Sequence, residues 1–523
     1  MKLSNLWNFV ADTNKRNMRN VFSGEGIFDP GGFFSDTQSR EASGRLSKYK
    51  TFREAYEGRG FNSMDADGNI EMSVNLNGPI INKTVDWLCG KPIEIEAVPG
   101  NQALSDRIMD VFEENDLSRQ FWCCGHSGAV AGDGYLYVTT DGDVANPIGK
   151  KTFIKYIKPQ FVHPIFHPLE TDKIAAVMIQ FPMDVPDSFA TSGYSSGQHV
   201  FSRVITENKI YEYLDDKMQE EIDNVFKIIP VFHAPNLLNA FRWFGTSDLA
   251  DVWLLNELRN DLSHSLKKIL EYNADPTTII IGASATNLEK GSERVWSIKN
   301  PDARVQLLEM NSDMAAVREC IASLKQACLE MASIPEFSLG MDAAVSNTSA
   351  AALEVRYMCL MEKTRRKRIT YGRALLGAAK LIAQIEMARE PALFGKLIVP
   401  EQWRRLAVIF PDPLPRDMEK VLLIEEQAIR MGVQSRYGAL REFKKKRIEE
   451  TMIEIIADDR MQMLKDVEQA RAVEGNVPNL HANFTGSLGM HVEKDMATRR
   501  EDDLVLKLQS QLQQTEKVVD NTV

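Results

Sequence analysis

The sequence contains no uninterrupted apolar run of about 18 residues, the length that a membrane-spanning helix needs. Its first residues also lack the continuous apolar segment of a signal peptide, because Ser4, Asn5 and Asn8 interrupt the apolar residues there. Residues 12–16 are polar throughout. We therefore expect no transmembrane helix and no membrane partner.

Cysteine is scarce: the 523 residues include six, and none of them forms a Cys-x-x-Cys pair. Cys123 and Cys124 are adjacent, while Cys320 and Cys328 lie eight apart in a stretch with helical periodicity. At a rise of about 1.5 Å per residue, the last two are too far apart for a disulfide. We expect reduced, mostly buried thiols in a cytosolic protein rather than the disulfide framework of a small secreted domain.

An excess of positive charge is also missing. Lys and Arg total 62 against 73 Asp and Glu, which gives a formal net charge of −11 at pH 7. Proteins that bind nucleic acid without sequence preference neutralise phosphates with a basic surface, so we expect this chain not to hold DNA tightly. An apolar fraction of 44% and a charged fraction of 26% are ordinary for globular proteins and exclude collagen and bulk disorder.

The motifs of nucleotide-binding and hydrolytic enzymes are absent. The segment Gly149–Thr152 comes closest to a phosphate-binding loop, but Val144 replaces the first glycine and Lys151 replaces the final Ser or Thr. No Gly-x-Ser-x-Gly sequence occurs. His163 and His167 are spaced like a helical metal pair, yet they lie in a strand-like stretch, where four residues span about 13 Å. We expect no catalytic residue, no metal site and no cofactor.

What the sequence does contain is a change of periodicity along its length. Residues 1–60 are polar and rich in Gly and Ser, which predicts an arm with little core of its own. Apolar residues at helical spacing predict helices near residues 79–90 and 105–129, the second with a break near Asn115. Runs of β-branched and aromatic residues predict a β-rich region between residues 135 and 233. Its strand candidates are Tyr135–Thr140, Phe153–Ile157, Ile174–Phe181, Val200–Ile205, Ile210–Leu214 and Phe226–Phe232.

A long helical hairpin with an insertion follows. Apolar residues recur at steps of three and four from Leu249 to Ile269 and from Val317 to Met331, which predicts helices over Ser247–Tyr272 and Asp313–Ser333. Three short strand candidates lie between them: Thr277–Ile281, Arg294–Ile298 and Arg304–Leu308. The pattern therefore predicts a small α/β module at the tip of the hairpin. Further helices are expected over residues 348–389 and 417–471, separated by a proline-rich segment.

Two groups of basic residues stand out against the acidic background. The first consists of Lys363, Arg365, Arg366, Lys367, Arg368 and Arg373, and the second of Lys444, Lys445, Lys446 and Arg447. Consecutive like charges spread around a helix, so both groups fit a solvated face or ion pairs with a neighbouring subunit. Contact with nucleic-acid phosphates is the alternative. The sequence leaves both interpretations open.

The order of these parts resembles the portal protein of a tailed bacteriophage, the head-to-tail connector of the long-tailed phages. Short stretches similar to that family occur in its order across about residues 75–475, and one of them ends an early helix with a Gly-Lys-Pro step. They are Asn77–Ile93, Ala131–Val138, Ile229–Asn236, Phe244–Leu249, Ile334–Gly340, Ser346–Ala352 and Pro413–Asp417. No single stretch is as specific as a phosphate-binding loop, so the resemblance depends on their order and on the module inserted between two helices.

The resemblance implies an α+β fold with portal architecture: a β-rich wing, a long helical stem hairpin, a small inserted α/β clip and a helical C-terminal crown. The implied boundaries are 1–60 for an N-terminal arm, 61–246 and 349–410 for the wing, 247–273 and 313–333 for the stem helices, 274–312 for the clip, 334–348 for a tunnel-loop region, 411–475 for the crown and 476–523 for a polar tail.

The resemblance also implies a function without catalysis. Twelve copies would form a ring at one capsid vertex, the channel through which double-stranded DNA is packaged and ejected. Implied partners are the terminase large subunit, a head-completion adaptor, and the major capsid and scaffold proteins. The chain would lie in the virion and, during assembly, in the host cytoplasm. Two other classes stay open: an enzyme whose site is assembled from dispersed residues, and a helical scaffolding protein.

Three sets of candidate residues follow from the resemblance and from the charge pattern. The tunnel loop is expected at Ser338, Leu339, Gly340, Met341, Asp342, Ala343, Ala344, Val345, Ser346 and Asn347. Each stem helix carries more carboxylates than cations, and the expected channel-lining residues are Asp248, Asp251, Glu257, Asp261, Glu319 and Glu330. DNA or inter-subunit contacts are expected at Arg365, Arg366, Lys367, Arg368, Lys444, Lys445 and Lys446. A channel lined by carboxylates would repel phosphates mildly and let DNA slide.

Overall fold

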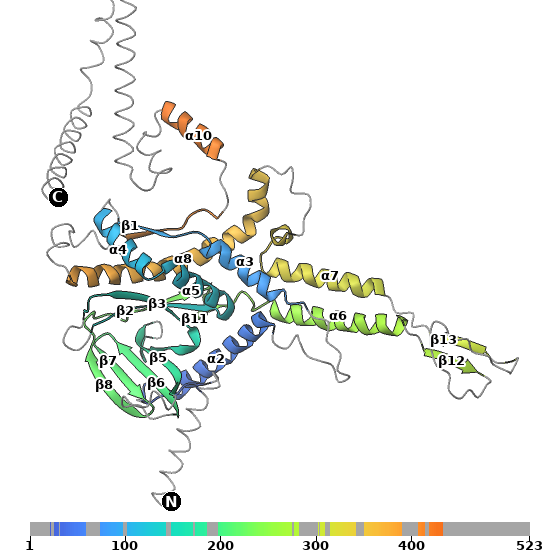
Figure 1. Cartoon of the computed structure of the whole chain (residues 1–523), viewed down its shortest axis with the longest axis horizontal. Helices are drawn as coiled ribbons and strands as arrows, with labels where there is room; N and C mark the ends of the chain where they lie inside the picture. The colour runs from blue at the N-terminus through green and yellow to red at the C-terminus, as the bar shows by residue number, and fades with distance from the viewer. Residues whose placement is uncertain are drawn as a thin grey trace, which may run out of the picture. The chain divides into compact units, whose positions relative to one another are not determined.

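The computed structural model describes residues 21, 26–30, 32–58, 74–97, 102–142, 148–170, 173–185, 197–274, 277–281, 302, 304–308, 314–340, 350–389, 406–413 and 418–431. The chain divides into two compact units, Met1–Pro415 and Arg416–Val523. In the second unit the described residues form the helix α10 (Met418–Arg430). The elements below belong to the first unit, where helices and sheets are mixed as the α+β expectation requires (Figure 1).

Two antiparallel sheets of three and five strands form the β-rich part of the first unit. The smaller sheet has the order β3-β2-β9, with β3 (Thr152–Ile157), β2 (Asp133–Thr140) and β9 (Val231–Pro235). The larger sheet runs β4 (Val162–Phe166), β5 (Ile174–Val185), β6 (Gly197–Thr206), β7 (Lys209–Leu214) and β8 (Lys217–Asp223). The first five strands predicted from the sequence are confirmed.

The sixth predicted strand, Phe226–Phe232, is wrong at its start, because strand β9 begins only at Val231. Residues 225–228 form a turn instead, in which Lys227 adopts a φ of 54° and the Asn224 side chain donates to the Ile228 carbonyl at 2.8 Å. The strand-like stretch at His163 is confirmed as β4, whereas the sequence misses strand β8. Strand β8 is an exposed edge strand, so its residues lack the apolar and polar alternation by which a half-buried strand is recognised.

Helices cover the smaller sheet and form the main core with it. They are α3 (Asn77–Cys89), α4 (Gln102–Glu114), α5 (Leu117–Ala131) and α8 (Ala350–Arg389), and all were expected. The expected break near Asn115 is confirmed, because Asp116 adopts a φ of 50° and its side chain accepts from the Arg119 amide to begin α5. Along α8, Tyr371, Leu375 and Ile382 are buried in the core.

A short two-stranded sheet adds a contact that the sequence does not reveal. Strand β1 (Glu94–Ala97) pairs antiparallel with β14 (Leu406–Ile409), and Ile95 and Leu406 are buried in the main core. The segment after β14 then runs along α8, where Arg368 donates to the Pro411 carbonyl at 2.8 Å. This pairing joins the end of α3 to a segment some three hundred residues later.

Part of the expected N-terminal arm is built into the fold. Residues 36–57 form the helix α2 (Asp36–Glu57), which begins at a Ser35 capping box and ends at Gly58. Its residues Leu46 and Tyr49 are buried against the larger sheet, and Ala55 is buried between α3 and α5. The expectation that residues 1–60 contribute little core is therefore wrong for this helix.

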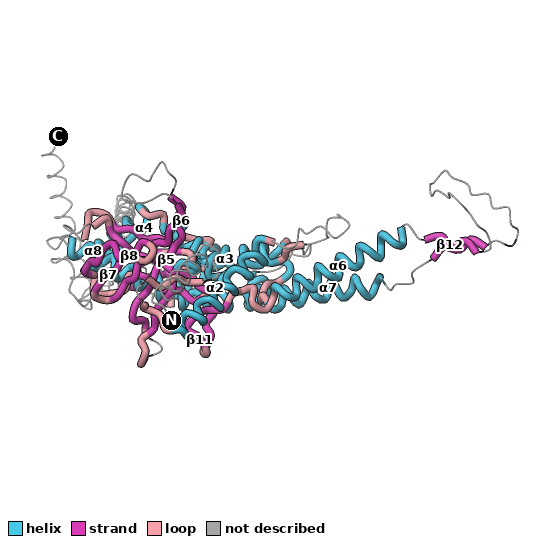
Figure 2. The backbone as a smooth tube through the Cα atoms, turned by 90° about the horizontal axis from the view of Figure 1, so that it is seen from below, coloured by secondary structure: helices cyan, strands magenta, loops and turns pink. Residues whose placement is uncertain are grey.

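The hairpin and its inserted module are confirmed as elements. Helices α6 (Trp253–Ala274) and α7 (Met314–Met331) lie side by side, and β12 (Thr277–Ile281) pairs with β13 (Arg304–Leu308) beyond their ends (Figures 1 and 2). The third strand candidate, Arg294–Ile298, lies outside the described residues. Helix α6 begins at Trp253 rather than at Ser247, because the Ser247 hydroxyl bonds the end of α5 and residues 248–252 form turns.

All six cysteines are free thiols, as expected. The expectation that most of them are buried is wrong, because only Cys124 and Cys328 are buried and Cys320 and Cys359 are exposed. None of the helices in the described ranges combines the length and the apolar character needed to cross a membrane.

Candidate functional site

The α6–α7 hairpin exposes much of its surface. At its base, Val252 packs with Cys328 and Leu329 in a core cluster, with Leu255 against it. Four large apolar side chains of α6 remain exposed, and no described residue covers them; by helical spacing three of them lie opposite Val252, and Leu270 lies on the side of Val252 near the far end of the helix. The four are Leu254, Leu258, Leu270 and Tyr272. A face of this kind is suited to contact with another chain.

The hairpin carboxylates expected to line a channel fall into two groups. Asp251, Asp261, Glu319 and Glu330 are exposed on the hairpin and its base. Glu257 is half-buried, and its pKa is raised by partial burial and by the nearby charge of Asp261. These five side chains are accessible to solvent, as a channel lining requires. The sixth candidate, Asp248, behaves differently.

Asp248 is a buried ion-pair residue and cannot line a channel, so the expectation is wrong at this position. Its side chain is 0% exposed, and its Oδ1 lies 3.0 Å from the Nζ of Lys363. Its Oδ2 pairs with the Nζ of Lys367. Burial alone would raise the pKa of Asp248, but the two lysines together hold it below its ordinary value. Burial lowers the pKa of Lys367 to about 8.

This three-residue ion cluster, Asp248 with Lys363 and Lys367, joins the base of the hairpin to α8. Asp248 lies just before α6, and both lysines lie on α8. Lys363 also donates to the Ala332 carbonyl, just after α7, at 2.8 Å. One buried cluster therefore fixes both ends of the hairpin to the same helix. The sequence offered no signal for it beyond the basic residues of α8, because the partners are far apart along the chain.

The basic residues of α8, like the hairpin carboxylates, divide into buried and exposed side chains. Lys367 is buried in the ion cluster, so its expected contact with DNA or another subunit is wrong. Arg368 is half-buried and packs over the Phe410 ring, with its Cζ 5.3 Å from the ring centroid. Arg365 and Arg366 are exposed and accessible to a partner. Lys444, Lys445 and Lys446 lie outside the described residues.

The expected tunnel loop is described only at its start. Ser338 and Leu339 end the short helix η3 (Glu336–Leu339), and Gly340 follows with a φ of 80°, a conformation that favours glycine. Residues Met341–Asn347 lie outside the described residues. Phe337 anchors η3 to the start of α8, with its ring centroid 4.8 Å from that of Tyr357.

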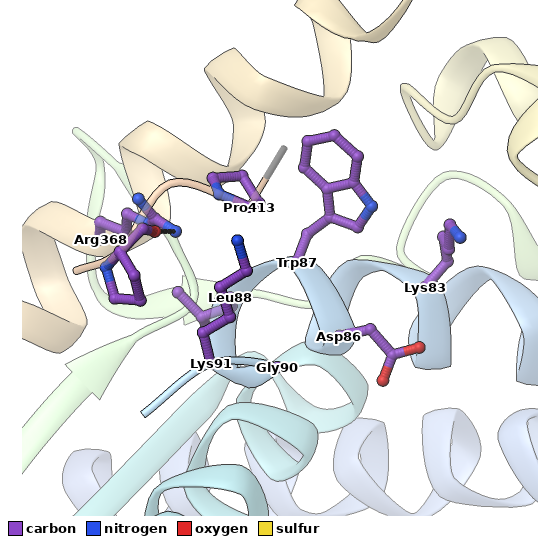
Figure 3. Close-up of a pocket in the computed structure, with 9 residues that line it drawn as sticks. Lys83, Asp86, Trp87, Leu88, Gly90, Lys91, Arg368 and Pro413 are labelled. Carbon is purple, nitrogen blue, oxygen red and sulfur yellow. Dashed lines mark hydrogen bonds between the residues drawn. The ribbon is translucent and has the colours of Figure 1, made fainter. Parts of the chain in front are cut away.

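A cleft that the sequence did not predict lies where α3 ends beside α8. It encloses about 340 Å³ between these helices and the segment after β14 (Figure 3). Its apolar walls come from Trp87, Leu88, Pro411 and Pro413, and its charged groups are Lys83, Lys91, Arg368 and Asp86. The only sequence signal was the glycine at the end of the helix, which marks a helix end and gives no hint of a cleft.

The described residues contain no cluster of side chains suited to binding a metal ion. Within those residues, no three or more His, Cys, Asp and Glu side chains gather in a way that could hold a metal ion. His163 lies buried in β4, and burial lowers its pKa well below the ordinary value. His167 lies after that strand and accepts from the amides of Leu169 and Glu170 at 3.3 Å.

Comparison with known proteins gives three results. The model of the family described as phage portal protein, SPP1 Gp6-like, matches residues 40–462. No protein in the curated set matches. Two similar solved structures are "Virion of native gene transfer agent (GTA) particle", with 12% identity and a TM-score of 0.40, and "Neck of empty GTA particle computed with C6 symmetry", with 11% identity and a TM-score of 0.43. The matches cover 76% and 75% of this chain and 92% of each matched chain. Because the family match spans most of the sequence, the chain belongs to the SPP1 Gp6-like family of phage portal proteins.

Proposed function

We propose that twelve copies of this chain form a ring at one capsid vertex, and that the ring is the channel for packaging and ejecting double-stranded DNA. The observation that carries the proposal is the α6–α7 hairpin, whose exposed apolar residues include Leu254, Leu258 and Tyr272. Neighbouring hairpins in a ring would bury these side chains, whereas a monomer leaves them in water. Membership of the portal family supports the same arrangement.

In this ring the α6–α7 hairpin is the stem, and its carboxylates face the DNA. Asp251, Asp261, Glu319 and Glu330 are exposed, and Glu257 is partly so. Fixed negative charge repels the phosphate backbone at the distances over which salt does not screen it, about 8–10 Å at physiological ionic strength. DNA then passes without being held. This role needs no catalytic residue and no cofactor.

The module that contains β12 and β13 is the clip in this proposal, and it binds the terminase large subunit and then a head-completion adaptor. Among the described residues β12 and β13 pair only with each other, and Ile279 and Ile281 on β12 are exposed. Exposed strand edges and apolar side chains are suited to a protein partner. Replacing residues 274–312 with a short linker should leave ring assembly intact and abolish both interactions in a pull-down.

The remaining regions receive the roles of their portal counterparts. The two sheets with α3, α4, α5 and α8 form the wing, which contacts the major capsid and scaffold proteins, and the second unit contributes to the crown. The loop after Gly340 is the tunnel loop. The protein lies in the virion, after assembly in the host cytoplasm.

The oligomeric state of the purified protein tests the proposal. Multi-angle light scattering should give a mass near twelve times 59.0 kDa, about 708 kDa, and negative-stain images should show rings with a central hole. Monomers or dimers at micromolar concentration and physiological salt would overturn it. Turnover of a substrate by a small oligomer would instead favour an enzyme, and filaments without holes would favour a scaffolding protein.

A further inference from the structure

A short β-hairpin on the first unit ends in two large apolar side chains exposed to solvent. Strands β10 (Leu237–Asn239) and β11 (Arg242–Thr246) pair antiparallel around a two-residue turn. Phe241 in the turn is 94% exposed and Leu238 is 66% exposed. Figure 2 shows β11 at the margin of the first unit.

This hairpin is held firmly at its base. The Phe241 amide donates to Asn239 Oδ1 at 2.9 Å, which fixes the turn. The Trp243 ring stacks on His233 with centroids 4.0 Å apart, and the Gly245 amide donates to the buried Asp133 carboxylate at 2.9 Å. The exposure of Phe241 is therefore a property of an ordered turn. Rigid, exposed aromatic residues are the typical anchors of protein interfaces.

The cleft beside α8 offers a complementary surface on the same chain. Its walls combine an indole ring, a leucine and two prolines with three cations, and Asp86 lies at its edge (Figure 3). Lys91 and Arg368 are held in the wall, because Lys91 donates to the Asp412 carbonyl and Arg368 to that of Pro411. Arg368 Nε is buried and has no hydrogen-bond partner among the described residues.

The composition of the cleft favours an aromatic side chain over nucleic acid. A DNA duplex is too wide to enter a cavity of about 340 Å³, and its phosphates would leave the indole and proline walls without a partner. An aromatic ring satisfies both parts of the wall, because it packs on apolar groups and its face attracts cations. The cation that follows the ring in the hairpin, Arg242, also matches the carboxylate of Asp86.

We propose that the β10–β11 turn of one copy inserts Phe241 into the cleft of the next copy, between Trp87 and Arg368. The inference rests on the ring proposed above and specifies one of its contacts. The inserted turn and the receiving cleft are different surfaces of the same chain, so the contact is heterologous and repeats from copy to copy. A contact of this kind closes into a ring when its rotation permits, as the proposed ring requires.

Cysteine cross-linking tests this contact directly. The parent for the test carries Cys320→Ser and Cys359→Ser, which remove the two exposed thiols. In this parent, Phe241→Cys together with Lys83→Cys at the mouth of the cleft should give a ladder of cross-linked copies with a short bis-maleimide. Leu169→Cys is the matched control for the turn, because Leu169 is 88% exposed on a different turn. Paired with Lys83→Cys, it should give no ladder.

Assembly of substituted chains gives a second, independent test. Phe241→Lys places a cation against the cations of the cleft, and Lys83→Trp fills the cleft mouth from an accessible position. Each variant alone should need at least about 30-fold more protein to assemble than the parent, the effect expected for an interface anchor. Mixed together, they restore one native contact per pair, so mass photometry should detect a heterodimer where each variant alone is monomeric. Leu169→Lys should assemble like the parent.

The outcomes separate this inference from the function on which it rests. A parent ring without the Phe241–Lys83 ladder, or Phe241→Lys rings as stable as the parent's, would overturn the contact and leave the ring proposal standing. A parent that forms no ring would overturn both. No ladder in the absence of DNA, together with protection of Lys83→Cys from the maleimide by duplex DNA, would assign the cleft to nucleic acid and would also overturn the contact.

Discussion

The Nζ of Lys363 lies 3.0 Å from Oδ1 of Asp248 in the interior of the protein, and this pair joins the chain before α6 to the middle of α8. Lys367 pairs with the second oxygen of the same carboxylate. The hairpin proposed as the stem is therefore attached to α8 by buried charge as well as by apolar packing. Two predictions follow from the cost of burying these groups.

Replacing Asp248 should destabilise the monomer strongly. Asp248→Asn leaves two buried lysines without a counter-charge, and breaking a buried pair costs about 3–5 kcal/mol of unfolding free energy. Urea unfolding followed by circular dichroism measures the change. The matched control is Asp251→Asn, because Asp251 is exposed and close in sequence, and it should shift the free energy by less than about 0.5 kcal/mol. Equal effects of the two substitutions would contradict the structural role of Asp248.

Stability should depend on pH through Lys367. Burial lowers its pKa from 10.5 to about 8, so above pH 8 the unfolded chain binds more protons at this residue than the folded protein does. The contribution of Lys367 therefore becomes more favourable as pH rises from about 8 toward 10, by at most about 1.4 kcal/mol per pH unit. Lys367→Met has no titrating group there and keeps the pair of Asp248 with Lys363.

Urea unfolding of the parent and of Lys367→Met at pH 6, 7, 8 and 9 checks this prediction. The difference in unfolding free energy between the two proteins should change between pH 8 and 9 in favour of the parent, and should stay constant below pH 7.5. Taking the difference removes the contribution of tyrosines and cysteines, which is common to both proteins. Parallel profiles over the whole range would contradict the lowered pKa.

Asp248, expected to line the channel and found buried, illustrates what the sequence could and could not predict. Helical periodicity placed it on the first stem helix, and the stripe from Leu249 onward is a true apolar pattern. Periodicity carries no information on where a helix begins when a turn is fixed by distant atoms, here the carbonyls of Ala129 and Val130 that accept from Ser247. Nor does it reveal ion pairs with residues more than a hundred positions away.

The sheets and the cleft make the same point. Strand β6 has one buried face and alternates, and strand β2 is buried on both faces over most of its length and is dense in β-branched and aromatic residues, so the sequence predicts both. Strand β14 has four residues and depends on pairing with β1, far away in sequence. The cleft at Trp87 depends on that pairing as well, because it brings Pro411 and Pro413 to the end of α3. Such features become visible only in the fold.

The exposed face of α6 should control assembly without affecting the folded monomer. Leu258→Ser removes an apolar side chain that is exposed in the monomer, so thermal unfolding should change little, whereas ring assembly should need more protein. Leu255→Ala is the contrasting variant, because Leu255 packs against the core cluster at the hairpin base and its truncation should cost about 2–3 kcal/mol of unfolding free energy. Mass photometry across a dilution series measures assembly. Unchanged assembly of Leu258→Ser would argue against a stem interface on this face.

Reversing the hairpin charge should convert a weak DNA binder into a strong one. Asp261→Lys with Glu319→Lys places new cations on the exposed surface of α6 and α7 in every copy, where they can neutralise phosphates. Fluorescence anisotropy with labelled duplex should show tighter binding, with an affinity that falls steeply as salt rises. The control is Glu220→Lys with Asp223→Lys on β8, which adds the same charge away from the hairpin. If both pairs raise affinity equally, net charge explains the effect and the hairpin does not line the channel.

Shortening the loop after Gly340 should separate assembly from DNA handling. Pro335 begins η3, and the contact of Phe337 with Tyr357 holds η3 on α8. A deletion within Met341–Ser346 leaves Pro335 and this ring contact unchanged. Rings should therefore form with the mass and thermal stability of the parent. If the segment closes around DNA as a tunnel loop, particles assembled with the shortened chain should package less DNA or lose it after packaging, measured as nuclease-protected DNA per particle. The control is a deletion of the same length within residues 186–196, which connect β5 to β6 in the sequence, and it should not change the amount of protected DNA. Full-length, stably retained DNA in particles with the shortened segment would show that it is an ordinary connection between two helices.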